Sequence, residues 1–156
     1  MEINYKLQTE KEEYKTYNNK VVKLKTTYKL KINLPYWIDG FYLSNFFSTK
    51  LKGTDNVVVN IDQGFTSGSG LNRRRNYYIY FPIYTTAKCN NDDTFDETKG
   101  VHICETKAEI KALETVKKFI LKLKNIISID KCSEFTISIL DNRIDKNYGH
   151  LNILNK

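Results

Sequence analysis

The clearest pattern along the chain is a strict alternation of apolar and polar positions between residues 22 and 34. A period of two over this length predicts a β-strand with one face on the core and the other in water. The core-facing positions are Val22, Leu24, Thr26, Tyr28, Leu30, Ile32 and Leu34. The solvent-facing positions include four lysines, Lys23, Lys25, Lys29 and Lys31. The sequence therefore predicts a strand with a row of positive charge along its exposed face.

Shorter alternating stretches predict further strands. Within residues 1–19, a short N-terminal strand is expected at 3–8, and the polar residues from Thr9 onward are expected to join it to the long strand as a hairpin. A short strand is also expected at 57–61. The most aromatic run of the chain, 75–86, predicts another strand. Its side chains on one side include Tyr78, Tyr80 and Tyr84. Because Pro82 cannot donate a hydrogen bond to a sheet, we expect this strand to bulge or to lie at an edge.

Helical spacing is present in two segments. Residues 36–49 predict a short, aromatic-rich helix. A longer helix is expected from Thr106, which forms a capping box with Glu109, and apolar residues then recur every three to four positions. A last strand is expected at 134–140, followed by a loose polar tail at 142–156.

These elements predict an α+β fold within one domain of 156 residues. From residue 22 onward the order is strand, helix, strand, strand, helix, strand, the βαββαβ order of ferredoxin-like folds, here with an extra N-terminal strand. We expect an antiparallel sheet of four to five strands, with two helices on one face and the other face open. Many RNA-binding domains share this order, but their two signature strand motifs are not matched here.

Positive charge is concentrated in the N-terminal half. The formal net charge is +7, and residues 14–86 hold 11 Lys or Arg against three acids, whereas the remaining segments sum to −1. This asymmetry favours polyanions as partners. The chain also has 11 tyrosines against one tryptophan and is rich in Asn, Lys and Ile. That usage is consistent with an A+T-rich genome such as that of a virus or phage, and such codon bias enriches lysine without any partner.

Three of the four arginines are consecutive, between a Gly/Ser-rich stretch at 64–70 and the aromatic strand. Arginine binds phosphate or carboxylate through two hydrogen bonds and also stacks on rings. If strands 22–34 and 75–86 are neighbours, cations would meet backbone phosphates on the open face while bases stack on tyrosines. The candidate nucleic-acid-binding residues are Arg73, Arg74, Arg75, Lys23, Lys25, Lys29, Lys31, Tyr78, Tyr80 and Tyr84.

The function expected from this surface is non-enzymatic binding of single-stranded nucleic acid, RNA or DNA. A second interpretation uses the same residues to bind an acidic host protein, as an accessory protein of a virus or phage that inhibits a nucleic-acid-processing or defence complex. A third interpretation involves no partner: a solvated lysine face, tyrosines over a second small core, and arginines in a mobile loop.

Other chemistries find little support. The stretch 64–70 lacks the Lys and the following helix of a phosphate-binding loop. His102 and the three cysteines, Cys89, Cys104 and Cys132, match no common zinc spacing. The acidic loop 90–97 lacks the ligand pattern of an EF-hand, although its Phe95 is a candidate docking anchor. The exposed lysines of the long helix are a further, weaker candidate polyanion surface: Lys107, Lys111, Lys118 and Lys122. No cofactor or metal is expected.

Compartment is inferred from cysteine usage and hydropathy. Three cysteines without a CxxC pair favour a reducing environment. The N-terminal residues lack the apolar core of a signal peptide. Since no apolar run approaches the roughly 18 residues that a membrane helix needs, we expect a cytoplasmic protein.

Overall fold

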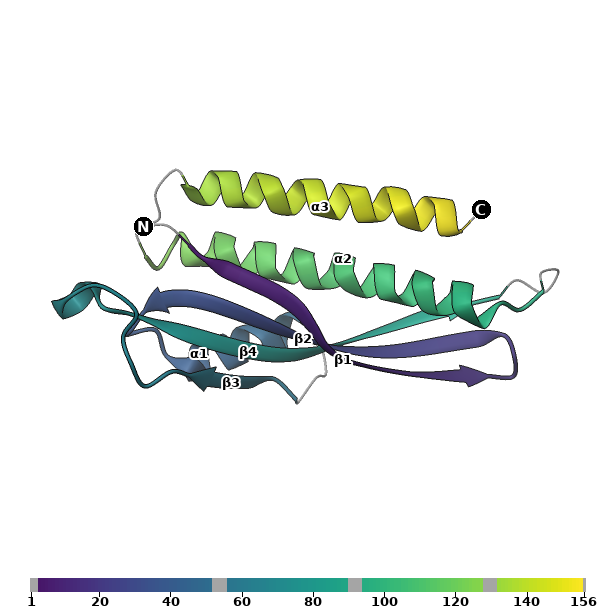
Figure 1. The fold of residues 1–156 in the computed structure, drawn as a ribbon, viewed down its shortest axis with the longest axis horizontal. Helices are drawn as coiled ribbons and strands as arrows, with labels where there is room; N and C mark the ends of the chain where they lie inside the picture. The colour runs from purple at the N-terminus through teal and green to yellow at the C-terminus, as the bar shows by residue number, and fades with distance from the viewer. Residues whose placement is uncertain (1–2, 52–55, 90–93, 128–131, 156) are drawn as a thin grey trace.

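The computed structural model describes residues 3–51, 56–89, 94–127 and 132–155. It shows a mixed α+β fold with a four-stranded antiparallel sheet and three α-helices (Figure 1). The elements in chain order are β1 (Tyr5–Tyr17), β2 (Val21–Pro35), α1 (Gly40–Lys50), β3 (Val58–Ile61), the 3-10 turn η1 (Gly70–Asn72), β4 (Arg74–Lys88), α2 (Glu97–Leu123) and α3 (Cys132–Leu154).

The order of strands in the sheet is β1-β2-β4-β3. β2 and β4 form its centre and are paired along their full lengths, from Val21 opposite Lys88 to Pro35 opposite Arg74. β1 is far longer than the sequence suggested, because the polar residues after Thr9 continue the strand as one arm of a hairpin. Asn18 and Asn19 form the turn between β1 and β2, with φ angles of 52° and 51°. Asparagine tolerates this conformation better than most residues do.

Pro82 lies where β4 has a neighbour on one side only. β3 pairs with Tyr77 to Tyr80 and no further, whereas β2 continues past Pro82. The missing N–H of proline is therefore tolerated without a bulge in this pairing, as at a sheet edge. Along the free part of this edge, two lysines of α2 supply donors: Lys107 Nζ to the Thr86 carbonyl at 3.0 Å and Lys111 Nζ to the Tyr84 carbonyl at 3.2 Å.

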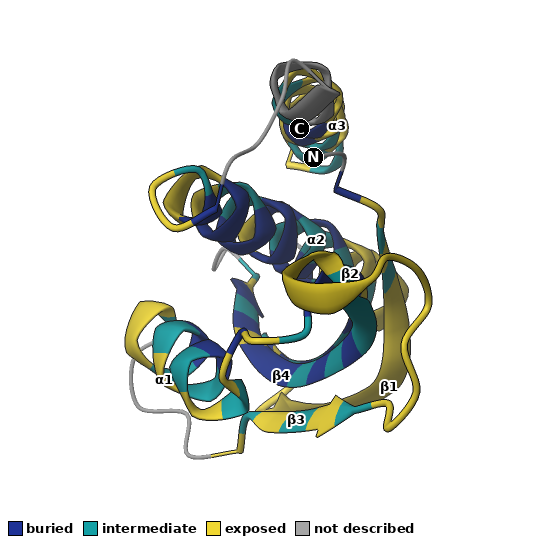
Figure 2. Ribbon diagram, turned by 90° about the vertical axis from the view of Figure 1, so that its left-hand side faces the viewer, coloured by how far each residue is buried: buried dark blue, intermediate teal, exposed yellow. Residues whose placement is uncertain are grey.

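The core forms on the face of the sheet that carries the apolar positions of β2 and β4. Aromatic rings join three elements there. Phe47 of α1 lies 5.1 Å from Phe81 of β4 and 5.3 Å from Phe119 of α2, measured between ring centroids. Figure 2 shows the sheet curving around α2, with α3 on the outer side of α2. This arrangement directs the alternate, lysine-bearing positions of β2 away from the core.

Tyr77 fixes the chain where β2 ends. Its buried hydroxyl lies 3.0 to 3.2 Å from the carbonyl oxygens of Pro35, Tyr36 and Ile38, and it can donate to one of them at a time. Burial raises the pKa of this hydroxyl, so it remains a donor. The contact ties the start of β4 to the turn between β2 and α1.

The predicted start of the long helix at Thr106 is wrong. α2 begins at Glu97, where the Asp96 carboxylate accepts the Lys99 backbone N–H at 3.1 Å, a standard N-cap contact. Thr106 lies inside the helix, and its hydroxyl donates to the His102 carbonyl at 2.9 Å. Such a bond to the residue four positions earlier satisfies a buried threonine without ending the helix.

The predicted strand at 134–140 and the loose tail at 142–156 are also wrong. Residues 134–140 and 142–154 belong to α3, which packs on α2. Its contacts include buried Leu140 and Ile144, an ion pair between Asp141 and Lys117, and a 3.2 Å bond from Arg143 to Glu109. The ferredoxin-like order therefore fails at its last element, and β1 occupies the edge beside β2. Among the described residues, no helix has the length and apolar character needed to cross a membrane.

Substitution of two helical glycines, one in α2 and one in α3, would test how these helices pack. Gly149 of α3 has open space around its missing Cβ, whereas a Cβ on Gly100 of α2 would lie 2.7 Å from Val22 Cγ2. Replacing a helical glycine by alanine stabilises by about 0.5–1 kcal/mol where nothing clashes. We expect Gly149→Ala to raise the free energy of unfolding by about that amount. Gly100→Ala should lose this gain to the clash with β2. Urea unfolding measures both variants, and an unchanged Gly149→Ala protein would argue against a helical C-terminal segment.

Candidate nucleic-acid interface

The register between β2 and β4 brings the predicted lysines and tyrosines together. Residues directly opposite each other in an antiparallel pair share a face, with Cβ atoms about 4.5–5.5 Å apart. The structure pairs Lys25 with Tyr84, Lys29 with Tyr80, and Lys31 with Tyr78. We call this side of the sheet, opposite the helices, the lysine face. The two strands therefore alternate cation and ring across one surface.

The lysine face extends onto β1 and to both ends of β4. By strand register it carries nine cationic positions, three on β1, four on β2 and two on β4, against one acid, Glu13. The cations are Lys6, Lys11, Lys15, Lys23, Lys25, Lys29, Lys31, Arg74 and Lys88. Because the whole chain has a net charge of +7, all its other residues together sum to −1. These strand positions thus carry the net positive charge of the protein, and Asp62, just after β3, adds one acid to the face beside Tyr78.

Lysine ammonium groups lie against the tyrosine rings of the face. Lys29 Nζ is 5.2 Å from the ring centroid of Tyr78 and 5.8 Å from that of Tyr80. Lys25 Nζ is 5.9 Å from the ring centroid of Tyr84. These are cation–π distances. Tyr78 and Tyr80 are half-buried among these neighbours, whereas Tyr84 is 52% exposed.

Tyr78 is also held at its hydroxyl. The Tyr78 hydroxyl donates to Oδ2 of Asp62 at 3.2 Å, from the chain just after β3. Desolvation, followed by the bond to the Asp62 carboxylate, raises the pKa of Tyr78, so the phenol remains protonated. With its hydroxyl fixed and a lysine at the ring, Tyr78 is the most constrained of the three tyrosines.

The three arginines do not share one side of the sheet. Arg74 pairs with Pro35 and lies on the lysine face, where its Nη2 donates to the Asn33 carbonyl at 3.1 Å. Arg75 pairs with buried Leu34 and therefore lies on the other side. The expectation that all three guanidinium groups project with the lysines is wrong, because successive residues of a strand alternate between its faces.

Arg73 and Arg75 meet instead at the ring of Phe65. Their guanidinium carbons lie 4.4 and 4.7 Å from its centroid, and that of Arg73 also lies 4.9 Å from the ring of Tyr36. Tyr36 and Phe65 contact edge to face at 5.9 Å. We call these four residues the arginine–Phe65 cluster. It lies where β4 begins, beside the end of β2.

The connection between β3 and β4 is folded rather than a free flexible tip. Ser67 forms an isolated β-bridge with Arg74, and Thr66 accepts a 2.7 Å hydrogen bond from the Asn33 amide. Gly68 has a φ of 82°, and a Cβ there would lie 2.0 Å from the Asn72 carbonyl oxygen. Only glycine fits this position without strain. The loop therefore positions Phe65 against the arginines.

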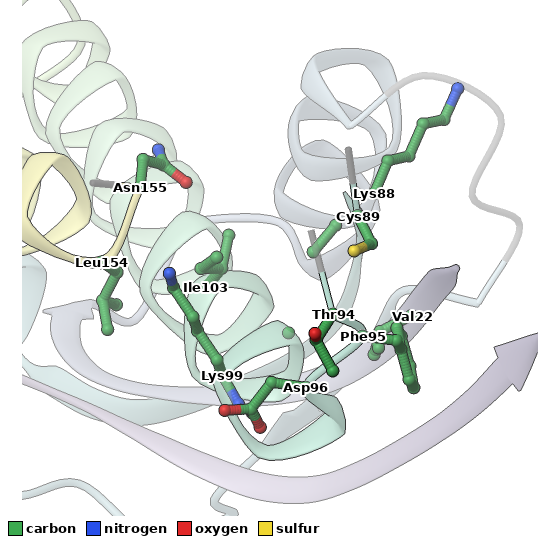
Figure 3. A pocket seen from close by; sticks show the side chains of 12 residues that line it. Val22, Lys88, Cys89, Thr94, Phe95, Asp96, Lys99, Ile103, Leu154 and Asn155 are labelled. Carbon is green, nitrogen blue, oxygen red and sulfur yellow. The ribbon is translucent and has the colours of Figure 1, made fainter. Parts of the chain in front are cut away.

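A cavity of about 370 Å³ lies at the opposite end of the sheet, between the start of α2 and the end of α3 (Figure 3). Asp96 lines it and already caps α2, so its negative charge opposes an anion at that helix start. Phe95, expected as a docking anchor, packs within this protein against a small cluster containing Val22, Leu24, Ala87 and Cys104. Its loop residues 90–93 lie outside the described residues.

His102 and Cys104 both lie within α2. Cys104 is buried and its thiol is 3.5 Å from the Val22 carbonyl. Burial raises the pKa of the Cys104 thiol, which disfavours the reactive thiolate. In the part of the chain that the structure describes, no group of three His, Cys, Asp or Glu side chains is arranged to hold a metal ion. The side chain of Cys132 lies outside that part.

No protein-family model, no curated protein and no solved structure matches the chain.

Two adjacent glutamates mark the boundary between the faces. Glu12 lies across from buried Thr26 and faces α2, where desolvation and then the nearby Glu105 carboxyl raise its pKa. Glu13 lies on the lysine face, and a bond from Lys11 at 2.9 Å lowers its pKa. The same strand thus places the Glu12 carboxyl toward the helices and the Glu13 carboxyl among the cations of the lysine face.

These opposite shifts predict opposite effects on stability. Because the folded state raises the pKa of Glu12, protonation of this carboxyl stabilises the fold. This stabilisation is complete below the unfolded pKa of about 4.3 and is lost as pH rises through the folded pKa. Glu12→Gln should therefore stabilise the protein at pH 7 and change little at pH 3. Glu13→Gln, the control, should give no stabilisation at pH 7. Urea unfolding midpoints across pH measure both; equal behaviour of the two variants would contradict the assignment.

Proposed function

We propose that the protein binds single-stranded nucleic acid on the lysine face. The observation that carries this proposal is the pairing of Lys25, Lys29 and Lys31 with Tyr84, Tyr80 and Tyr78 across β2 and β4. Lysines along a groove or strand attract the phosphate backbone, and tyrosine rings beside them offer surfaces on which bases stack. Lys23 and Lys31 are eight positions apart along β2, which corresponds to about 26 Å at ~3.3 Å per residue.

A single strand suits this surface better than a duplex because its bases are free to leave their own stack. Base stacking on an aromatic side chain contributes about 1–3 kcal/mol, whereas an exposed cation–π contact contributes about 0.5–1 kcal/mol. A base can therefore displace a lysine from a tyrosine ring. The displaced ammonium stays within reach of the phosphate that accompanies the base. Lysine and tyrosine then serve the two parts of one nucleotide.

Arg74 supplies the terminal cation of the face. It lies beside Lys31, Asn33 and Asn76 at the edge of a shallow cavity of about 500 Å³. Its planar fork suits phosphate oxygens. In this proposal Arg74 and the four β2 lysines contact the backbone, while Tyr78, Tyr80 and Tyr84 contact bases. RNA and DNA share both groups, so the arrangement accommodates either.

The second candidate function is binding of an acidic protein, such as a host nucleic-acid-processing or defence protein bound by a viral or phage factor. One observation favours it: ammonium groups already lie against all three tyrosine rings. A partner that offers only carboxylates would use the lysines without displacing them. It would gain nothing from the rings, so removal of a tyrosine separates the two functions.

Charge removal from the face should lower the salt dependence of binding. Each phosphate contact on a single strand contributes about 0.7 to the slope of log affinity against log salt. Lys29/Lys31→Gln should therefore flatten the slope for a labelled oligothymidylate by about 1.4. The control is Lys118/Lys122→Gln, which removes the same charge from exposed positions of α2. Fluorescence anisotropy measures both. An equal loss in the control would mean that net charge, or the weaker candidate surface on α2, sets the binding instead of the lysine face.

Tyrosine removal should distinguish nucleic acid from an acidic protein. Tyr84→Leu should weaken oligonucleotide binding about 5- to 150-fold, which corresponds to the loss of one stacking contact. Tyr148→Leu on α3 is the control, since Tyr148 is 45% exposed, close to the 52% of Tyr84. Binding of polyglutamate, a carboxylate-only polyanion, should be unaffected by either change. Oligonucleotide affinity unchanged in Tyr84→Leu would contradict the stacking role.

A further inference from the structure

Arg73 and Arg75 lack an acidic partner among the described residues. Arg143 is bonded to Glu109 at 3.2 Å, whereas no carboxylate is paired with Arg73 or Arg75 in the described part of the chain. Arg73 donates through Nε to the Gly70 carbonyl at 3.0 Å, and the buried Nε of Arg75 has no hydrogen-bond partner among those residues. Both side chains are half-buried. Their observed anchorage is therefore largely the Phe65 ring.

This arrangement leaves positive charge uncompensated. An aromatic ring attracts a guanidinium through its quadrupole but does not neutralise it. Two like charges against one ring also repel each other, and partial burial removes some of the water that would screen them. The remaining N–H donors of each fork suit an oxyanion, which binds two guanidinium groups with charge-assisted hydrogen bonds. The arginine–Phe65 cluster thus has the charge and donors of a phosphate site.

The position of the cluster indicates where such a phosphate comes from. Arg73 and Arg75 flank Arg74, which lies at the end of the lysine face. At this point the neighbour of β4 is not β3, which pairs only from Tyr77 onward, but the segment 66–67, which bonds to the backbone of Arg74. A nucleic-acid strand that leaves the lysine face at Arg74 would therefore pass around this folded connection, which carries Phe65, and meet the two arginines on the other side.

We propose that Arg73 and Arg75 bind a backbone phosphate of the same single strand after it has passed around the start of β4. This inference rests on the proposed function and extends it. It assigns the arginine triplet to a site where the bound nucleic-acid strand turns. Arg74 lies on one side of the sheet at this site, and Arg73 and Arg75 lie on the other. Phe65 and Tyr36 hold the guanidinium groups so that their free N–H edges meet the phosphate.

Probe length tests the inference. Single-strand-binding OB folds cover about 4–16 nucleotides. We therefore expect an oligothymidylate of four nucleotides to contact the lysine face alone, and one of sixteen nucleotides to contact both the lysine face and the arginine–Phe65 cluster. Arg73/Arg75→Gln should flatten the salt slope by about 1.4 on the longer probe, the amount expected for two phosphate contacts at about 0.7 each. The slope on the shorter probe should stay near that of the wild type. Lys118/Lys122→Gln is the charge-matched control, and retained short-probe binding shows that the variant is folded.

Each outcome has one meaning. If the wild type binds neither probe, the proposed function fails, and this inference fails with it. If the wild type binds both but the variant keeps the full slope on the longer probe, the function stands and the inference is overturned. Equal loss on both probes also overturns it, because the arginines would then act on folding or on the lysine face itself. A selective loss on the longer probe supports the inference.

Discussion

The antiparallel register between β2 and β4 is the constraint on which the rest of the structure depends. It places lysines opposite tyrosines on one face and apolar side chains opposite each other on the face beneath the helices. A slip of one residue would exchange the two faces and bury four lysines, at a desolvation cost that hydrophobic contacts do not recover. Contacts at one end hold the register: the Asn33 amide donates to Asn76 at 3.1 Å, and the Tyr77 hydroxyl lies under the carbonyls that follow β2.

Local periodicity predicted the strands better than it predicted the helices. The alternation at 22–34 is long enough to admit one interpretation, and the structure places a strand there. At the C-terminus, Ile137 and Ile139 alternate with polar residues over too short a run to exclude a helix. The decisive spacing is Ile137, Leu140, Ile144 and Leu151, which places four apolar side chains toward the core. In the structure these side chains pack against α2, a tertiary contact that a local pattern at 134–140 does not contain.

The candidate site was predictable in its strands but not in its arginines. Lysines and tyrosines were assigned to the correct faces because each strand was interpreted with a period of two. Arg73 and Arg74 were assigned to the connection before the strand, where no such rule applies, and only Arg75 to the strand itself. Since β4 begins at Arg74, alternation separates Arg74 from Arg75. Phe65, which comes from a Gly/Ser-rich stretch without periodicity, had no sequence signal that linked it to Arg73 or Arg75.

The lysine–tyrosine contacts within the face bear on both the affinity and the choice of ligand. Ordering a free lysine side chain costs up to about 1.5–2 kcal/mol in rotamer entropy. A lysine already held at a ring has lost part of that freedom before any ligand arrives, so less remains to be lost when it meets a phosphate. The cost is that the ring must exchange its ammonium for a base. Because stacking is the stronger of the two contacts, the exchange is favourable only for a ligand that brings unpaired bases together with phosphates. A polyanion without bases cannot stack on the rings, and a duplex keeps its bases stacked on one another. The tyrosine rings that hold the lysines therefore select for a single strand.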